Sequence, residues 1–93
     1  MVDGFEWNEN KARQNFANHG VSFVEATTVF LDPLSIVVDD PDHSWSEQRF
    51  IIIGYSNRRR LLVVIHTDRG DNIRINSARL ATSYERRTYE EGN

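Results

Sequence analysis

The sequence contains no cysteine, a single lysine and no long apolar segment. The absence of cysteine excludes a disulfide framework and a thiolate metal site. The longest uninterrupted apolar run, Leu61 to Ile65, is too short to span a membrane. The N-terminus carries Asp3 and Glu6 and lacks the basic and then apolar pattern of a signal peptide. We therefore expect a soluble cytoplasmic protein without a membrane partner.

The chain also has no internal repeat and no low-complexity linker. Its 93 residues, 39% of them hydrophobic, are enough for one modest core and leave no room for a second domain. We expect residues 1–93 to form a single domain.

The basic residues are almost all arginine, and they are distributed unevenly. Up to Glu47 there are nine acidic and two basic residues, a net charge of −7; from Gln48 onward nine arginines outnumber five acidic residues, a net charge of +4. A guanidinium group can bind two phosphate oxygens at once and stays charged at any working pH. The second half of the chain therefore points to nucleic acid, although the total charge is −3.

Two helices are expected near the N-terminus, at residues 9–18 and 23–31. Asn8 is suited to cap the first, and Ser22 followed by Glu25 is the pattern of a capping box for the second. The aromatic residues expected in the core are Trp7, Phe16, Phe23 and Phe30.

After Leu34 the apolar pattern changes to a period of two or to continuous runs, which predicts strands. A third helix is expected to begin at a second capping box, Thr82 to Glu85, and to end near Glu91. The expected strands are 5–7, 35–39, 49–56, 60–67 and 72–77. The fold class is therefore α+β, with two N-terminal helices, an antiparallel meander of three to four strands and a short C-terminal helix.

The segment 68–70, Asp-Arg-Gly, is typical of a three-residue hairpin loop with glycine in the left-handed position. That loop pairs Ile65 with Ile73 on an apolar face and leaves His66 and Arg74 on the other, polar face. We therefore expect these two polar side chains at the same end of the sheet.

Four residues near this end have the chemistry needed to cleave RNA through its own 2′-hydroxyl. The reaction requires a base, an acid and cations that stabilise the charge developing on the phosphate. Arg74 and Arg79 suit the last role, His66 suits proton transfer at neutral pH, and Glu85 is a weaker candidate for proton transfer.

Simpler explanations exist for each of these positions. An exposed sheet face with a histidine and an arginine is often only a solvated surface, and Glu85 is already explained as a capping residue. Arg58, Arg59 and Arg60 lie at a predicted hairpin tip, where they suit either an RNA backbone or plain solvation. The acidic segment 39–43 lacks the glycine and glutamate of a calcium loop, so we expect no metal site.

The chain resembles the BrnT family of toxins from type II toxin–antitoxin systems, through an ordered series of short motifs that covers nearly its whole length. The motifs are Phe5-Glu6-Trp7, Asn10-Lys11-Ala12, His19-Gly20-Val21-Ser22-Phe23, Glu25-Ala26, Phe30-Leu31-Asp32-Pro33, Ile65-His66-Thr67, Ile73-Arg74-Ile75, Ser77-Ala78-Arg79, Ala81-Thr82, Glu85-Arg86 and Tyr89.

This resemblance implies a RelE-like ribonuclease fold, RNA cleavage that arrests translation and growth, and no cofactor. It also implies a BrnA-type antitoxin with a ribbon-helix-helix DNA-binding part, together with which the toxin represses its own operon at the operator DNA. The positions it suggests for RNA cleavage or binding, with those from the residues themselves, are Arg74, Arg79, His66, Glu85, Arg58, Arg59, Arg60, Lys11, His19 and Arg86.

Two features depart from the family pattern. Asn76 stands where members often have an aliphatic residue, next to Arg74. The acidic N-terminal half is unusual for an RNA-cleaving toxin, and either orients RNA or binds basic parts of the antitoxin. A catalytically inactive module that only binds the antitoxin and operator, and a general single-strand RNA binder using the arginines at 58–60, are the competing hypotheses.

Overall fold

The computed structural model describes residues 2–41 and 47–92. In chain order the elements are β1 (Phe5–Glu6), α1 (Glu9–His19), α2 (Phe23–Thr28), the 3₁₀ helix η1 (Val29–Leu31), β2 (Ile36–Asp39), β3 (Arg49–Tyr55), β4 (Leu61–Arg69), β5 (Asn72–Leu80) and α3 (Ser83–Glu91). The α+β class and the three predicted α-helices are confirmed. No helix among the described residues is long and apolar enough to cross a membrane.

The five strands form one mixed sheet in the order β1-β5-β4-β3-β2. β2 to β5 make the predicted antiparallel meander, but β1 pairs with β5 in parallel. The expectation of a purely antiparallel sheet of three to four strands is therefore wrong. Nothing in the short Phe5–Glu6 segment signals a partner some seventy residues away.

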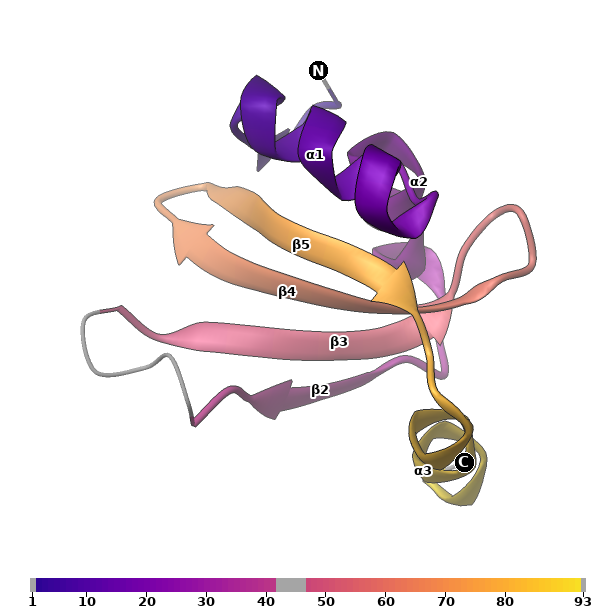
Figure 1. Ribbon diagram of the computed structural model, residues 1–93. Helices are drawn as coiled ribbons and strands as arrows, with labels where there is room; N and C mark the ends of the chain where they lie inside the picture. Colours follow the sequence, from indigo (N-terminus) through magenta and orange to yellow (C-terminus); the bar gives the residue numbers. More distant parts are fainter. Residues whose placement is uncertain (1, 42–46, 93) are drawn as a thin grey trace.

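The sheet separates two apolar clusters. Helices α1 and α2 lie on one side of it and α3 lies on the other (Figure 1). On one face, here called the α1/α2 face, Phe23 and Ala26 of α2 pack against Ile52, Leu62 and Val64. On the other, here called the α3 face, Tyr89 of α3 packs against Ile53, Leu61 and Val63. The alternation of neighbouring residues between the two clusters is the period-two pattern expected of central strands. Because α3 covers only one end of its face, the rest of that face is left without a helix above it (Figure 1).

Helix α1 is attached to the sheet through a polar residue. Asn15 is buried and uses its side-chain amide to donate to the Ala78 carbonyl (2.7 Å) and to accept from the Ala78 N–H (3.1 Å). Phe16, which we expected in the core, is 56% exposed. A hydrogen-bonded amide next to a strand edge thus occupies the inward position that the apolar pattern assigned to Phe16.

The caps explain where the helices begin and end. Asn8 accepts from the Lys11 N–H, and Gly20 ends α1 with a φ of 68°, as predicted. Thr82 and Glu85 form the full predicted capping box of α3. The box at Ser22 is only half formed, because the Glu25 carboxylate turns inward instead of capping the helix.

Candidate nucleic-acid interface

The hairpin between β4 and β5 sets which side chains share a face, and its register differs from the predicted one. β4 extends to Arg69 and β5 begins at Asn72, so the loop is the two residues Gly70 and Asp71. Gly70 has a φ of 62°, which fits the first central position of a type II′ turn. The predicted three-residue loop is wrong, and so is the pairing of Ile65 with Ile73, because Ile73 pairs with Asp68.

A β-bulge at Asn76 brings two arginines to one face. His66 pairs with Ile75 and Ile65 pairs with Ser77, which leaves Asn76 as an extra residue on β5. Arg74 and Arg79 are an odd number of positions apart and would point to opposite faces of a regular strand. With the extra residue between them, Arg74 lies opposite Thr67 and Arg79 opposite Val63.

Both partners belong to the α3 face, since Val63 packs on α3 and Thr67 follows it at a spacing of four along β4. The bulge is held by the Asn76 side-chain amide, which donates to the Thr67 hydroxyl at 2.8 Å. Asn76 and Thr67 are both buried. Asn76, which the sequence analysis singled out, therefore supports the backbone beside Arg74.

Arg79 is oriented by Glu85 at the start of α3. Its Nη1 and Nη2 donate to the two carboxylate oxygens at 2.7 and 2.8 Å, and the same carboxylate caps the N–H of Thr82. The hydrogen bonds from Arg79, acting with those from Thr82, lower the pKa of Glu85 to about 2 against the opposing effect of burial. Glu85 is therefore ionised at neutral pH and holds Arg79 in one orientation.

This pairing leaves one edge of the guanidinium group available. The Nε–H of Arg79 makes no hydrogen bond with the described residues, and Nη2 carries a second N–H besides the one given to Glu85. Its side chain is 39% exposed. The Nε and Nη2 edge can therefore bind a phosphate in the bidentate way while Glu85 remains attached.

Arg74 is paired more loosely, with Glu6 of β1 at 3.1 Å. Glu6 also accepts from Asn72, and the hydrogen bonds from Asn72 and Arg74 lower its pKa. Sequence patterns did not reveal Glu6 as a partner, because the two residues meet only through the parallel pairing of β1 with β5.

Arg49 is a third arginine on the α3 face that the sequence did not single out. It lies opposite Thr67 on the neighbouring strand. Its Nε is buried without a hydrogen-bond partner among the described residues, and the nearest paired carboxylate oxygen, of Glu47, is 4.0 Å away. The sequence did contain a signal for this position. Side chains alternate along a strand, so Arg49 shares a face with Ile51 and Ile53 of β3.

His66 does not join the arginines, contrary to our prediction. It is 5% exposed and lies on the α1/α2 face, where its ring contacts Phe30 edge-on and stacks on Phe50. Neither ring nitrogen has a hydrogen-bond partner within the described part of the chain. Burial lowers the pKa of His66, so the ring is neutral at pH 7. The sheet itself separates it from Arg74 and Arg79.

The arginines at the β3–β4 hairpin have different environments. Arg60 forms a bidentate ion pair with the buried Glu25 and donates to the Gly20 carbonyl, which explains why the Ser22 capping box is incomplete. The hydrogen bonds from Arg60 lower the pKa of Glu25. Arg58 and Arg59 are exposed, with one Arg58 nitrogen 3.9 Å from Glu25.

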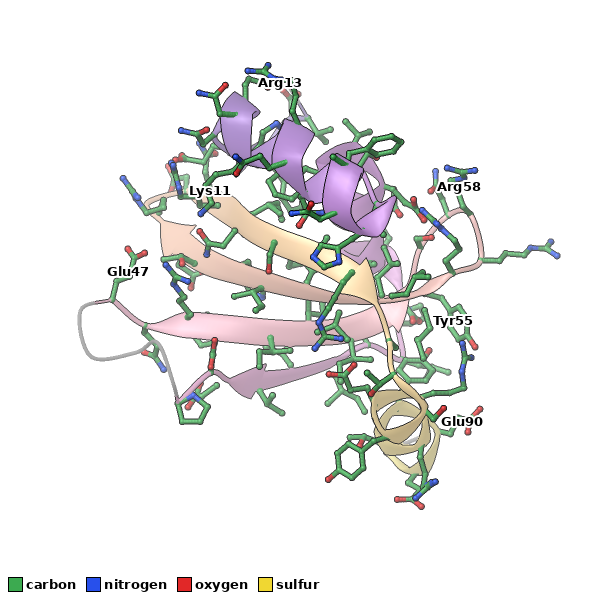
Figure 2. All side chains as sticks on the ribbon, in the orientation of Figure 1. Lys11, Arg13, Glu47, Tyr55, Arg58 and Glu90 are labelled. Atoms are coloured by element: carbon green, nitrogen blue, oxygen red, sulfur yellow. The ribbon has the colours of Figure 1, made fainter. Side chains whose placement is uncertain are left out.

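The remaining predicted contacts are spread over the molecule. Figure 2 shows Lys11 on α1 and Arg58 at the hairpin, both away from α3, beside which Tyr55 lies. His19 is the last residue of α1 and is exposed. Arg86 lies on α3 and donates to the Tyr55 hydroxyl at 3.0 Å. Of the predicted residues, Arg74 and Arg79 therefore lie on the α3 face of the sheet, and Glu85 and Arg86 lie on α3 itself.

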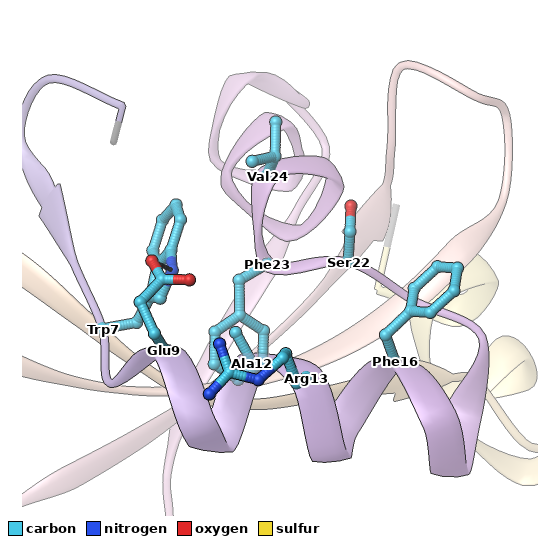
Figure 3. A pocket seen from close by; sticks show the side chains of 8 residues that line it. All are labelled: Trp7, Glu9, Ala12, Arg13, Phe16, Ser22, Phe23 and Val24. Atoms are coloured by element: carbon cyan, nitrogen blue, oxygen red, sulfur yellow. Dashed lines mark hydrogen bonds between the residues drawn. The ribbon is translucent and has the colours of Figure 1, made fainter.

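Two further features lie outside this interface. An apolar recess of about 470 Å³ opens between α1 and α2, and its lining includes Phe16, Phe23 and Val24 (Figure 3). Among the described residues no group of three or more acidic, histidine or cysteine side chains could hold a metal ion. Residues 42 and 43 of the acidic segment considered above lie outside the described residues.

A sheet with two helices on one face, and with a third helix and several arginines on the other, defines a small α+β protein with a cationic sheet face. A family model described as ribonuclease toxin, BrnT, of type II toxin–antitoxin system matches residues 7–85. The chain belongs to the BrnT family of ribonuclease toxins, and the resemblance stated from its motifs is confirmed.

The fold has a similar solved structure. The crystal structure of the Brucella abortus ribonuclease toxin, BrnT, determined at 1.1 Å resolution, matches with a TM-score of 0.65 and 26% sequence identity. The match covers 85% of this chain and 96% of that chain. A search of curated protein sequences found no significant match.

Proposed function

We propose that this chain is a metal-independent endoribonuclease with a RelE-like fold, the toxin of a type II toxin–antitoxin pair that cleaves RNA in the cytoplasm and arrests translation and growth. The observation that carries the proposal is the bulge at Asn76, which sets Arg74 and Arg79 on one open face. Membership in a ribonuclease toxin family supplies the reaction class.

In the proposed reaction the RNA 2′-oxygen attacks the adjacent phosphorus and the bond to the 5′-oxygen breaks. The products are a 2′,3′-cyclic phosphate and a free 5′-hydroxyl. Arg79, through its Nε and Nη2 edge, and Arg74 stabilise the extra negative charge on the phosphate oxygens as the new bond forms. Glu85 acts as a positioning residue, because an ion pair fixes the orientation of Arg79 before RNA arrives.

Proton transfer is assigned to water. A carboxylate with a pKa of about 2 is a weak base at neutral pH, and His66 is buried on the opposite face. The α3 face is open to solvent beyond α3, so water can take the proton of the 2′-hydroxyl and return one to the leaving 5′-oxygen. His66 then has a structural role, and the activity of a His66 variant tests that assignment.

The partners follow from the same proposal. A type II system pairs its toxin with a protein antitoxin, here a BrnA-type protein with a ribbon-helix-helix part that neutralises the toxin. The complex of the two represses its own operon by binding operator DNA. Arg58 and Arg59, exposed at the β3–β4 hairpin, are proposed as additional RNA backbone contacts, whereas Arg60 is engaged by Glu25.

The test is RNA cleavage by the purified chain in the presence of EDTA, with end-group analysis of the products. The proposal requires cleavage that EDTA does not abolish and cyclic phosphate ends. Intact RNA, or cleavage that only an added divalent cation restores, contradicts it.

A catalytically inactive binding module is the second candidate. The observation that favours it is that, among the described residues, the α3 face carries no histidine to act as acid or base. A chain that binds RNA or antitoxin tightly and leaves RNA intact under all conditions is the result that establishes this candidate.

A further inference from the structure

We propose that the free edge of β2 receives an extended segment of the antitoxin as a sixth strand, with aliphatic and basic side chains on that segment. This inference rests on the proposed function, because it identifies how the partner of the toxin docks. It concerns the edge of the sheet farthest from β5 and therefore a surface separate from Arg74 and Arg79.

The backbone of β2 has unpaired groups at its outer edge. The N–H of Asp40 donates to the Arg49 carbonyl at 2.9 Å, which fixes residues 40 and 49 as a hydrogen-bonded pair. Such pairs alternate along an antiparallel ladder. Ile36 and Val38 therefore direct their N–H and C=O groups to β3, and Val37 and Asp39 direct theirs outward. Within the described residues, no other strand lies beyond β2.

The two edges of the sheet differ in how far their backbone groups are covered. At the opposite edge, β5 is covered by β1 over two residues and by Asn15 of α1, which takes both backbone groups of Ala78. Natural proteins usually protect a free edge in this way or with lysine, proline or a bulge. β2 has none of these devices between Ile36 and Val38.

The side chains beside this edge are apolar on both faces of the sheet. Val37 is 53% exposed on the α1/α2 face, and Val38 is 48% exposed on the α3 face. Leu34, two residues before the strand, is also half exposed. Adding a strand would bury these side chains together with the outward backbone groups, which is the mode called β-augmentation.

Charge selects the kind of occupant. Residues up to Glu47 carry a net charge of −7, and Asp39 lies at the end of the strand. A second copy of this chain is a poor occupant because it carries a net charge of the same sign. In a symmetric antiparallel pairing of two β2 edges, Val37 of one copy would lie opposite Asp39 of the other. A segment that places lysine or arginine opposite Asp39 and aliphatic residues opposite Val37 and Val38 satisfies all three positions.

The test is residue-resolved amide hydrogen exchange on the full chain, free and in complex with its cognate antitoxin co-expressed from the same operon. In the free chain the outward amides of Val37 and Asp39 should exchange fast, and those of Val38 and Asp40 slowly. The antitoxin should slow the exchange of Val37 and Asp39 selectively. If the complex forms and these two amides stay fast, or if no complex forms, the proposal is overturned. Protection that rises with the concentration of the free chain alone identifies a second copy as the occupant and also overturns it.

A matched pair of variants provides an independent readout. Val37→Pro removes an outward N–H without removing a bond to β3, whereas Val37→Thr keeps the N–H and the branched side chain. The proline should weaken antitoxin binding by roughly tenfold and the threonine much less, since a lost backbone hydrogen bond and the ring clash together cost on the order of 1.4 kcal/mol. Equal affinities of the two variants contradict the proposal.

RNA cleavage by the free chain separates this inference from the proposed function. Val37→Pro should cleave RNA as the wild type does and escape neutralisation. A wild-type chain that cleaves no RNA but shows the selective protection refutes the enzyme and supports the edge. Normal cleavage and normal neutralisation of Val37→Pro refute the edge and leave the enzyme in place.

Discussion

At the scale of single residues, the proposed reaction depends most on Arg79, because Glu85 orients it and one edge of its guanidinium group faces no described partner. Arg79→Ala should lower the RNA cleavage rate by on the order of a hundredfold, the usual effect of losing a donor to a developing oxyanion. Arg79→Lys should recover little of it, because an ammonium group lacks the planar fork. The measurement is the single-turnover cleavage rate.

Arg87→Ala is the matched control, since Arg87 is an exposed arginine on α3. Its cleavage rate should stay within about threefold of wild type, the change expected of a peripheral charge. Equal rates for the two alanine variants would remove Arg79 from the mechanism.

His66 makes a prediction about pH rather than about catalysis. Its pKa is lowered by burial in the folded state, while in the unfolded chain it is near 6.5. As the pH falls below 6.5, His66 becomes protonated in the unfolded chain but stays neutral in the folded one. The contribution of neutral His66 to the free energy of unfolding is therefore fully present above this pH and decreases below it. The slope can reach about 1.4 kcal/mol per pH unit.

The measurement is the free energy of unfolding in urea between about pH 7.5 and pH 5. His66→Phe should abolish most of the slope in this range, because the carboxylates titrate at lower pH. It should also leave RNA cleavage nearly unchanged. A large loss of cleavage with normal stability would assign His66 a role in proton transfer.

At the scale of elements, the bulge on β5 places Arg74 and Arg79 on one face of the sheet, and a buried hydrogen bond from Asn76 to Thr67 supports it. Thr67→Val keeps the shape and removes the acceptor, leaving the Asn76 amide unsatisfied. It should lower the free energy of unfolding by about 1–3 kcal/mol. Ser77→Ala, at a neighbouring position whose hydroxyl makes no hydrogen bond with the described residues, should change it by less than about 0.5 kcal/mol.

These two variants are compared by urea unfolding at neutral pH. Similar losses of stability in both would mean that the contact between Asn76 and Thr67 does not support the bulge. The experiment also separates stability from catalysis, since neither Thr67 nor Ser77 is assigned a role in the reaction.

The helices could be predicted closely from the sequence because their signals are local. Asn8, Gly20 and the box from Thr82 to Glu85 act within one turn of the helix that they begin or end. The hairpin register could not be predicted in this way. The polar face of β4 was inferred only from the loop length that paired apolar residues with one another across the two strands. Once a bulge adds a residue, period-two counting assigns every later side chain to the wrong face.

Parts of the site were beyond sequence patterns for a related reason. The partnership of Arg74 with Glu6 depends on a parallel pairing across most of the chain, and that of Arg60 with Glu25 on the packing of α2 beside a hairpin. Glu25 and Glu85 show identical local spacing from a preceding hydroxyl residue. Only Glu85 forms a full capping box, because the buried Glu25 carboxylate is instead paired with Arg60.

At the scale of the whole molecule, the sheet separates His66 from the arginines of the α3 face, and this predicts how the cleavage rate depends on pH. Because the α3 face carries no histidine among the described residues, the cleavage rate should rise steadily with pH from about 6 to 9. The measurement is the single-turnover rate across that range at constant ionic strength. A bell-shaped profile centred near neutral pH would require an acid and a base that this account does not contain.

The most direct test of the central claim, that RNA binds the open part of the α3 face, is to map the contacts of an uncleavable RNA. Backbone NMR shifts of the chain would be followed during titration with an oligonucleotide whose 2′-hydroxyls are replaced by 2′-deoxy groups. The account predicts shifts concentrated at Thr67, Ser77, Arg79 and the start of α3, and none at the recess between α1 and α2. Shifts confined to α1, α2 or the hairpin at residues 57–60 would contradict it.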